Sequence, residues 1–265
     1  MRLAFQDTNI EFGELEQINN ALSELNADHI SFGLIPFTNI VSTGDEWIES
    51  TIMMGSTKLA KLCLRGVLPK YGIIFYDERK FDQSYYIRYL KSELLNSDAE
   101  FFKYGLIKDV VYTYECFIKP SSDLKYFAGT VLYPCDNTIS SELEKVRIID
   151  CDLSDDTWIL VNKYVINNIQ FEYRAFIINN EIIDCCQYIK NKKVTPRVLA
   201  DDIRSELYAY IDKIQEIYSP HDHYVIDIAE LDDGTFKVIE YNCINCSGVY
   251  VNNRALIYKK LMEII

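Results

Sequence analysis

One segment near the C-terminus, Val225–Tyr250, constrains the fold of this chain more than any other: VIDIAELDDGTFKVIEYNCINCSGVY. Residues typical of β-strands flank the pair Asp233 and Gly234. This pair predicts a tight turn, because glycine adopts a positive φ at little cost. The segment therefore predicts an antiparallel β-hairpin. Because side chains alternate along a strand, the hairpin also decides which polar residues share a face.

Two carboxylates and an amide gather on one face of this hairpin. With a two-residue turn, Asp227 lies opposite Glu240 and Ile228 lies opposite Ile239, while Asn242 shares the face of Glu240. A longer loop with a bulge would shift this register by one residue. Opposed carboxylates repel each other, and a cation between them removes the repulsion. Hard oxygen ligands suit Mg²⁺ or Mn²⁺, so Asp227, Glu240 and Asn242 predict a metal site. A solvated sheet face is the alternative.

Composition narrows the class of protein. The chain has 265 residues, which is enough for one large domain or two small ones. A net charge of −13 disfavours nucleic acid as the main partner, because phosphate binding needs a basic surface. No stretch is apolar enough to span a membrane, and Met1–Gln6 does not resemble a signal peptide. With eight scattered cysteines, we expect a cytoplasmic protein with reduced thiols.

Hydrophobic periodicity divides the chain into two parts. The first part predicts a mixed α/β domain with helices over 15–25, 56–64 and 81–95 and strands over 31–35 and 72–76. A break in the pattern at 96–105 places the boundary between domains 1–98 and 99–265. The second part predicts paired strands over 109–119, 127–132, 157–165, 171–178 and 181–188, with helices over 195–217 and 252–264. The expected fold class is α+β with a mostly antiparallel sheet and an α/β N-terminal part.

Three cationic residues precede the hairpin. Lys119 ends the predicted strand FIKP, Lys125 follows in a polar loop, and Arg174 lies inside the strand EYRAFI. A triphosphate needs such charges, with lysines as point cations and an arginine fork on the transferring group. Each lysine taken singly is more often a solvated strand end. For Arg174 the alternative is a structural ion pair with Glu172.

The order of these segments resembles a known family. FIKP, KYFAG, VNKYV, EYRAFI and DIAELDDGTFKVIEYN follow one another as in the ATP-grasp superfamily. The chain is most similar to the clade marked by one arginine and two lysines, which occurs in bacteria and their phages. The resemblance covers roughly residues 100–255. It implies an ATP-grasp fold, in which two α+β subdomains hold a nucleotide between them.

The resemblance also implies residue roles. Lys119 would bind the α- and β-phosphates, Lys125 would lie over them from its loop, and Arg174 would contact the transferring phosphate. Asp227, Glu240 and Asn242 would hold Mg²⁺ or Mn²⁺. The hinge beside adenine, Val161 to Val165, would include Asn162, Lys163, Tyr164 and Val165. The family often has an acid in this hinge, whereas Asn162 and Lys163 stand here, and the phosphate loop contains little glycine.

The activity that the resemblance implies is ATP-dependent ligation. Such proteins usually activate a carboxylate as an acyl phosphate, release ADP, and let an amine attack the acyl carbon. The acceptor would be a small molecule, a peptide or a protein side chain, without nucleic acid or membrane. The oligomeric state stays open, with a homodimer among the options. Two alternatives remain: a non-catalytic ATP-binding regulator, and a kinase that uses the same phosphate-binding residues.

Histidines and cysteines around the hairpin offer a competing interpretation. In the same register, His221 lies opposite Cys246, which makes a zinc site geometrically conceivable. Against it, Cys243 falls on the opposite strand face, and a single Cys-x-x-Cys is a weak zinc signal. Redox chemistry by these thiols is less expected still, since no thioredoxin-like context surrounds them.

Overall fold

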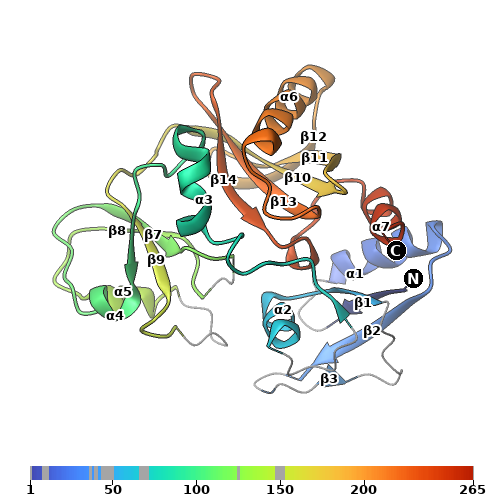
Figure 1. Cartoon of the computed structure of the whole chain (residues 1–265), viewed down its shortest axis with the longest axis horizontal. Coiled ribbons are helices and arrows are strands. Elements are labelled where there is room, and N and C mark those ends of the chain that lie inside the picture. Colours follow the sequence, from blue (N-terminus) through green and yellow to red (C-terminus); the bar gives the residue numbers. More distant parts are fainter. Residues whose placement is uncertain are drawn as a thin grey trace.

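The described residues form three β-sheets, which Figure 1 shows at the lower right, at the left and in the upper middle of the molecule. The computed structural model describes residues 2–7, 12–35, 38, 41–42, 51–65, 72–123, 126–146 and 153–264. The predicted α+β class with an α/β N-terminal part is confirmed, because four N-terminal strands are parallel and the other two sheets are antiparallel. None of the helices in these ranges is long and apolar enough to cross a membrane.

The N-terminal sheet has the strand order β3-β2-β1-β4-β5. Its elements are β1 (Arg2–Gln6), α1 (Phe12–Glu24), β2 (His29–Leu34), β3 (Val41–Ser42), β4 (Thr51–Met54), α2 (Thr57–Leu64) and β5 (Gly72–Ile73). Helix α2 begins after Ser56, whose Oγ accepts a hydrogen bond from the Leu59 amide at 3.3 Å. Its residues Leu59 and Leu62 pack against this sheet.

A smaller antiparallel sheet lies at the left of Figure 1, with the order β6-β9-β7-β8. Its elements are β6 (Glu100–Lys103), α4 (Tyr104–Ile107), β7 (Cys116–Pro120), β8 (Thr130–Leu132), α5 (Ile139–Leu143) and β9 (Trp158–Asn162). The strand predicted over 109–119 is shorter than expected and begins at Cys116. Its partner strands set this length, because β9 pairs only with Phe117–Pro120 and β8 only with Cys116–Ile118.

The third sheet is the largest and has the order β12-β11-β10-β13-β14. Its elements are β10 (Ile169–Ile178), β11 (Glu181–Lys190), β12 (Lys193–Val198), α6 (Asp201–Ile217), β13 (Tyr224–Leu231) and β14 (Phe236–Asn242), followed by the 3₁₀ turn η2 (Ile244–Cys246) and α7 (Arg254–Met262). The helix predicted over 195–217 is wrong in its first residues. Lys193–Val198 pairs with β11 as an edge strand instead, a position where Pro196 is tolerated because one strand side lacks a partner.

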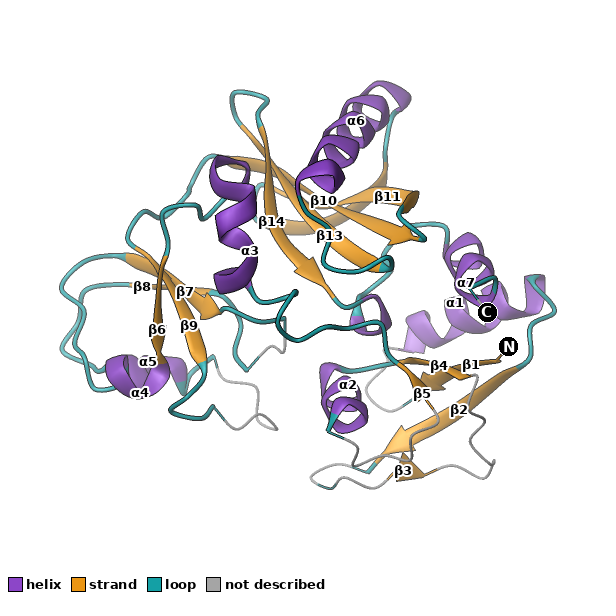
Figure 2. Cartoon of the chain, viewed as in Figure 1, coloured by secondary structure: helices purple, strands orange, loops and turns teal. Residues whose placement is uncertain are grey.

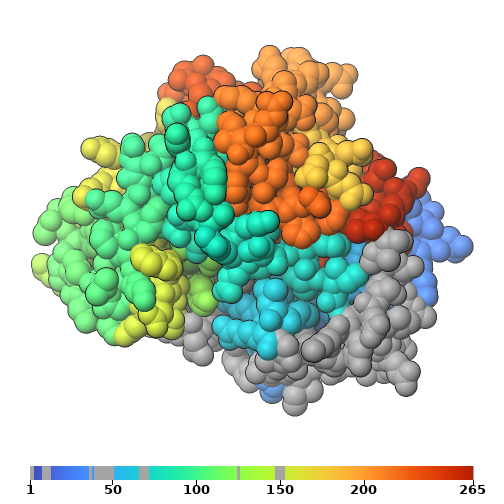
Figure 3. Space-filling view, viewed as in Figure 1, coloured from blue at the N-terminus to red at the C-terminus, as the bar shows by residue number. Residues whose placement is uncertain are grey.

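Two helices cover one face of this large sheet. Helix α3 (Gln83–Leu90), followed by the 3₁₀ turn η1 (Lys91–Glu93), places Tyr86 and Leu90 in one apolar core with Leu207 of α6 and Ile228 of β13. Figure 3 shows the side chains of α3 against those of the orange C-terminal elements. The domain boundary between residues 98 and 99 stays a prediction, although α3, which precedes it, packs on the large sheet.

The opposite face of the large sheet is apolar at one end of its strands and polar further along. At one end, Phe176 and Val225 pack with Ile257 of α7 and with Leu3 of the N-terminal sheet. Figure 2 shows α7 and α1 side by side near the two termini. Further along the same strands, two and four residues away, polar side chains replace the apolar ones. Because side chains alternate with a period of two, Arg174 and Asp227 share this face.

The last hairpin has the predicted pairing of Asp227 with Glu240, but its loop differs from the predicted one. Asp227 pairs with Glu240 as predicted, but Ile228 pairs with Val238 rather than with Ile239. The loop is one residue longer than expected: Leu231 donates its N–H to the Thr235 carbonyl at 2.9 Å, and Gly234 has a φ of 80°. An irregularity between Asp227 and Ile228 then shifts the register back. The two offsets cancel, so the acids still lie opposite each other.

Candidate active site

A cavity of about 470 Å³ lies between the small sheet and the large sheet. The small sheet contributes Phe117 and Lys119, and the large sheet contributes Glu172, Tyr188 and Glu240. An adjoining cavity of about 270 Å³ shares Lys119 and Glu240 with the first. The polar face of the large sheet therefore borders a cleft with walls from two sheets, the kind of place where proteins bind small ligands.

Lys119 and Glu240 join the two sheets across this space. The Nζ atom of Lys119, on β7, lies 2.5 Å from Oε2 of Glu240, on β14. The side chains are 11% and 28% exposed, so this ion pair is only partly screened by water. The sequence predicted Lys119 as a phosphate ligand and Glu240 as a metal ligand, and the structure brings them into direct contact.

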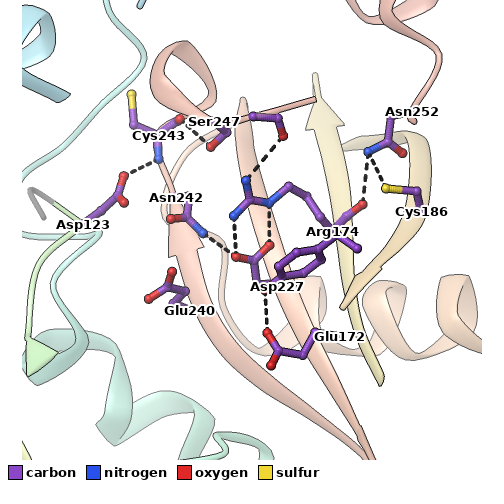
Figure 4. Close-up of polar contacts among 12 residues, drawn as sticks. Asp123, Glu172, Arg174, Cys186, Asp227, Glu240, Asn242, Cys243, Ser247 and Asn252 are labelled. Atoms are coloured by element: carbon purple, nitrogen blue, oxygen red, sulfur yellow. Dashed lines mark hydrogen bonds and ion pairs between the residues drawn. The ribbon is translucent and has the colours of Figure 1, made fainter. Parts of the chain in front are cut away.

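Arg174 and Asp227 form a second ion pair deeper in the large sheet. These residues face each other on the neighbouring strands β10 and β13. Arg174 donates from Nε to Oδ1 of Asp227 at 2.8 Å and from Nη2 to Oδ2 at 2.7 Å. The side chains are 7% and 2% exposed. Figure 4 shows the Asp227 carboxylate between this guanidinium and the amide of Asn242. The alternative interpretation of Arg174, a structural ion pair with Glu172, is therefore wrong in its partner, which is Asp227.

Electrostatics and aromatic rings hold the Arg174 guanidinium in place. Burial acts to lower the pKa of Arg174, but the charge and hydrogen bonds of Asp227 outweigh it and raise the pKa. The rings of Tyr188 and Tyr250 stack on each other, and their centroids lie 5.2 Å and 5.3 Å from the guanidinium carbon. Tyr250 has a φ of 52°, a conformation that non-glycine residues seldom adopt. Arg174 is thus fixed from several sides.

Asn242 provides the test of whether a metal ion fits here. Its Nδ2 donates to Oδ2 of Asp227 at 3.0 Å, which fixes the amide orientation. Its Oδ1 is buried and accepts no hydrogen bond from any residue that the structure describes. A buried amide oxygen without a donor is costly, and a hard cation would satisfy it. The donor set of Asp227, Glu240 and Asn242 therefore fits Mg²⁺ or Mn²⁺. Within the described ranges, no cluster of three or more His, Cys, Asp or Glu side chains forms a metal site.

The residues predicted for the adenine hinge are distributed around the larger cavity. Val165 lines it. Asn162, at the end of β9, is buried and donates from Nδ2 to Oδ1 of Asn96 at 3.1 Å, and Asn96 also lines the cavity. Lys163 forms an exposed ion pair with Glu100 at 3.2 Å, and Tyr164 is 71% exposed. Contacts of these four residues with adenine stay predictions.

The loop predicted to cover the phosphates is described in part. Lys125 lies outside the described residues. Gly129, at the end of the loop, lines both cavities. A Cβ atom at this position would approach the Phe117 ring to 2.9 Å and Cβ of Lys119 to 3.5 Å. A side chain here would have to displace the Phe117 ring, because the loop returns close to β7, beside the lysine that pairs with Glu240.

Asp123, in the same loop, was not predicted as a site residue. Its Oδ2 accepts a hydrogen bond from the Cys243 amide at 2.7 Å, directly after Asn242. The carboxylate is 9% exposed and lines the smaller cavity. Asp123 thus ties the start of the loop to the strand that carries the predicted metal ligands. Its place in a polar loop gave no signal in the sequence, because the partner lies 120 residues away.

Glu172 is a further residue that the sequence did not single out for function. It lines the larger cavity, and its Oε2 accepts a hydrogen bond from the Tyr188 hydroxyl at 2.7 Å. Burial raises the pKa of Glu172, and the charges of Asp227 and Glu240 add to this effect. Its position two residues before Arg174, on the same strand face, is the signal that could have identified it.

The raised pKa of Glu172 predicts a pH-dependent stability difference. A carboxyl group whose folded pKa is raised stabilises the fold below its ordinary value of 4.5 and loses that contribution as pH rises through the raised value. We therefore expect Glu172→Gln to be more stable than wild type at pH 7 and equal to it near pH 4. Urea unfolding at both pH values measures this. Glu181→Gln, at the exposed start of β11, is the control, and an equal effect of Glu172→Gln at both pH values would contradict the assignment.

The competing zinc interpretation depends on residues that take other roles. The Nδ1 atom of His221 accepts the His223 amide at 3.0 Å, and Nδ1 of His223 accepts the Asn179 amide at 3.0 Å. Burial lowers the pKa of both imidazoles. The strand β14 ends at Asn242, so Cys246 lies in the 3₁₀ turn η2 and not opposite His221. The extended hairpin that the zinc interpretation required is therefore absent from this part of the chain.

Comparison with solved structures identifies the fold. A RimK domain ATP-grasp protein from Sphaerobacter thermophilus is 14% identical, with a TM-score of 0.56 over 99% of this chain and 100% of that chain. D-cycloserine synthetase is 12% identical, with a TM-score of 0.58 over 99% of both chains. The D-alanine–D-alanine ligase from Bacillus anthracis complexed with ATP is 12% identical, with a TM-score of 0.56 over 99% of this chain and 96% of that chain.

The family assignment comes from the sequence of the C-terminal part. No curated protein matches the chain. The family defined as ATP-grasp domain, R2K clade family 2, matches residues 105–260, which is more than half of the chain. The matched region contains both ion pairs and all the residues that line the cavity between the two sheets except Leu95 and Asn96. The predicted resemblance is thus confirmed, and the chain belongs to the R2K clade family 2 of ATP-grasp domains.

Proposed function

We propose that this protein is an Mg²⁺-dependent ligase that couples ATP cleavage to the joining of a carboxylate and an amine. In this proposal ATP occupies the cavity of about 470 Å³ between the two sheets. Lys119 and Lys125 bind its phosphates, and Arg174 contacts the phosphate that is transferred. Family membership supports ATP as the substrate. The acyl-phosphate route and the formation of a C–N bond are the finer parts of the proposal.

The observation that carries the proposal is a second cavity beyond the Arg174 pair. This cavity has a volume of about 230 Å³ and lies between the N-terminal sheet and the loop that follows β14. Gly248 lines it, and the Gly248 carbonyl accepts a hydrogen bond from Nη1 of Arg174 at 3.3 Å. Arg174 therefore contacts one residue of each space: Tyr188, which lines the larger cavity, and Gly248, which lines the smaller one. A ligase needs both, arranged around one phosphate-binding cation.

Charges in the second cavity fit a small molecule with both a carboxylate and an amino group. Arg254 is 9% exposed and donates from Nη1 to the Tyr258 hydroxyl at 3.0 Å. Its Nη2 atom lies 3.2 Å from Oε1 of Glu14, whose side chain is 41% exposed. A carboxylate would be recognised by Arg254 and an ammonium group by Glu14. The small volume favours an amino acid or the end of a peptide over a large substrate.

In the proposed reaction, a carboxylate oxygen attacks the γ-phosphorus and the bond to ADP breaks, which gives an acyl phosphate. The amine nitrogen then attacks the acyl carbon, the C–O bond to phosphate breaks, and the nitrogen loses a proton. Arg174 orients and neutralises the transferred group, and the sheets exclude water from it. Asp227, Glu240 and Asn242 would hold Mg²⁺, which neutralises phosphate charge when bound.

Product analysis with an isotope label tests this proposal. The protein is incubated with Mg-ATP and pools of amino acids and peptides that carry ¹⁸O in their carboxylates. We expect ADP to form only with an accepted pool, and one ¹⁸O atom to appear in each phosphate released. Hydroxylamine should divert the acyl phosphate to a hydroxamate. Glu240→Gln serves as the inactive control.

Other products would point to other functions. AMP and pyrophosphate would indicate adenylation and contradict the acyl phosphate. A stable phosphorylated product without ¹⁸O transfer to phosphate would indicate a kinase. Binding of Mg-ATP without any product, across all pools, would favour a regulatory ATP-binding protein. The kinase remains the second candidate because it would use the same cavity between the sheets.

A further inference from the structure

Two of the three cations predicted for phosphate, Lys119 and Arg174, are each paired with an acid predicted for metal. Lys119 contacts Glu240 at 2.5 Å, and Arg174 contacts Asp227 through two hydrogen bonds of 2.8 Å and 2.7 Å. We infer that Lys119 and Arg174 act as internal counter-ions that prevent a divalent cation from binding without the nucleotide. This inference rests on the proposed assignment of metal and nucleotide to the site.

The contacts of Asp227 show why a metal ion alone is disfavoured. Its Oδ1 accepts from Nε of Arg174, and its Oδ2 accepts from both Nη2 of Arg174 and Nδ2 of Asn242. A metal ion that bound Asp227 in this state would lie beside a buried guanidinium. Two positive charges in a buried site repel strongly, because little water screens them.

The same argument holds for Glu240 and for the nucleotide. The Lys119 ammonium lies against the Glu240 carboxylate, so a metal ion at Glu240 must displace or face a cation. Phosphates that approach Lys119 without a metal ion would face the Glu240 and Asp227 carboxylates. Glu172 borders the same cavity and adds a third acid. Neither the metal ion alone nor the nucleotide alone therefore has a favourable site.

Metal ion and nucleotide together remove both conflicts. The cations exchange their carboxylate partners for phosphate oxygens, and the carboxylates exchange their cations for the metal ion. All charges are then compensated by new partners. Binding of the metal ion and binding of the nucleotide are consequently coupled, with each raising the affinity for the other by the same factor. The site thus discriminates the metal–nucleotide complex from the free metal ion.

The Lys119–Glu240 pair also connects the two sheets on either side of the proposed nucleotide site. It joins β7 of the small sheet to β14 of the large sheet, and it borders both cavities between them. With the pair intact, the two sheets are linked directly across the space that the nucleotide must enter. When the ligand binds, Lys119 contacts phosphate and Glu240 contacts the metal ion, so the two sheets are linked through the ligand. Occupancy of the cavity therefore depends on the nucleotide and on the metal ion.

Titration with Mn²⁺ tests the inference without any turnover. Free Mn²⁺ is measured by electron paramagnetic resonance, with and without a non-hydrolysable ATP analogue, for wild type and for Lys119→Met. In wild type, we expect the analogue to raise Mn²⁺ affinity by a factor in the range of about 5–150. In Lys119→Met, we expect the analogue-free affinity for Mn²⁺ to rise about tenfold, because the Lys119 ammonium no longer lies against Glu240, and the coupling to shrink.

Matched variants separate this effect from general damage. Lys119→Arg keeps the charge and should keep the coupling. Lys108→Met removes a comparable ion pair with Asp155, at 2.9 Å on an exposed surface, and should leave Mn²⁺ affinity unchanged. Lys119 is chosen over Arg174 because the Lys119–Glu240 side chains are 11% and 28% exposed, against 7% and 2% for Arg174 and Asp227. A purely structural role would lower the melting temperature without raising metal affinity.

The outcomes distinguish the inference from the proposed function. If the analogue binds with Mn²⁺ but analogue-free Mn²⁺ affinity in Lys119→Met does not exceed that of wild type, the counter-ion role is wrong and the ATP site stands. If wild type binds Mn²⁺ equally well with and without the analogue, the coupling is wrong. If no variant binds the analogue, with or without Mn²⁺, the proposed function fails and the inference fails with it.

Discussion

Replacing Arg174 with methionine is expected to lower the free energy of unfolding by about 3–5 kcal/mol, the cost of breaking a buried ion pair from one side. The reason is the Asp227 carboxylate, whose side chain is 2% exposed and which receives two hydrogen bonds from Arg174. Without the guanidinium, one amide hydrogen bond from Asn242 compensates this charge. The rings of Tyr188 and Tyr250 also lose their contact with the cation.

Urea unfolding of a small set of variants measures this effect. The double variant Arg174→Met with Asp227→Asn removes both charges, and we expect it to regain most of the stability while remaining inactive. Lys213→Met breaks a surface pair with Glu93 at 2.9 Å and should cost less than about 1 kcal/mol. An Arg174→Met protein as stable as wild type would show that Asp227 is compensated in another way.

A lysine at position 174 tests the geometry of the same pair. Lysine keeps the charge but cannot donate two parallel hydrogen bonds to the Asp227 carboxylate. Arg174→Lys should therefore be more stable than Arg174→Met, because a cation still lies near the carboxylate. Its turnover should stay low, since the fork that orients the transferred phosphate is lost. Recovery of full turnover in Arg174→Lys would exclude a role for the guanidinium geometry.

Replacing Glu240 with glutamine is expected to lower turnover by at least about 10²-fold, the scale for loss of one contact that stabilises transition-state charge. The proposed metal ion would lose one of its two carboxylates. Stability should change little, because the Glu240 side chain is 28% exposed and a glutamine oxygen can still accept a hydrogen bond from Lys119. Steady-state ADP release and thermal melting measure the two effects.

The control for this variant lies on the same hairpin. Glu230 on β13 accepts a hydrogen bond from the Tyr173 hydroxyl and does not line the cavity between the sheets. Glu230→Gln preserves that hydrogen bond and should leave turnover within a few-fold of wild type. Wild-type turnover in Glu240→Gln would remove Glu240 from the metal site. A large loss in both variants would indicate a general effect of the hairpin.

Local sequence determined the elements around the site. The Asp233–Gly234 pair specified the last hairpin, and Asp227 and Glu240 are paired as predicted. The spacing of Leu207, Ile211 and Ile214 specified the buried stripe of α6. These features depend on residues close in sequence, where periodicity and turn propensity are sufficient. The sequence also contained the family pattern, since the R2K clade family 2 matches residues 105–260.

Long-range pairing determined the structural features that local sequence did not. Lys193–Val198 became a strand because β11 offered a free edge, although Pro196 and the following residues favoured a helix start. Arg174 received Asp227 rather than Glu172 as its partner, since β10 lies beside β13 in the large sheet. Lys119 and Glu240 are 121 residues apart in the chain, and they are in contact because the small sheet faces the large sheet. The sequence by itself thus determined which charged residues the site contains, and only the tertiary structure determined their pairing, because contacts across strands and sheets depend on packing that no local pattern encodes.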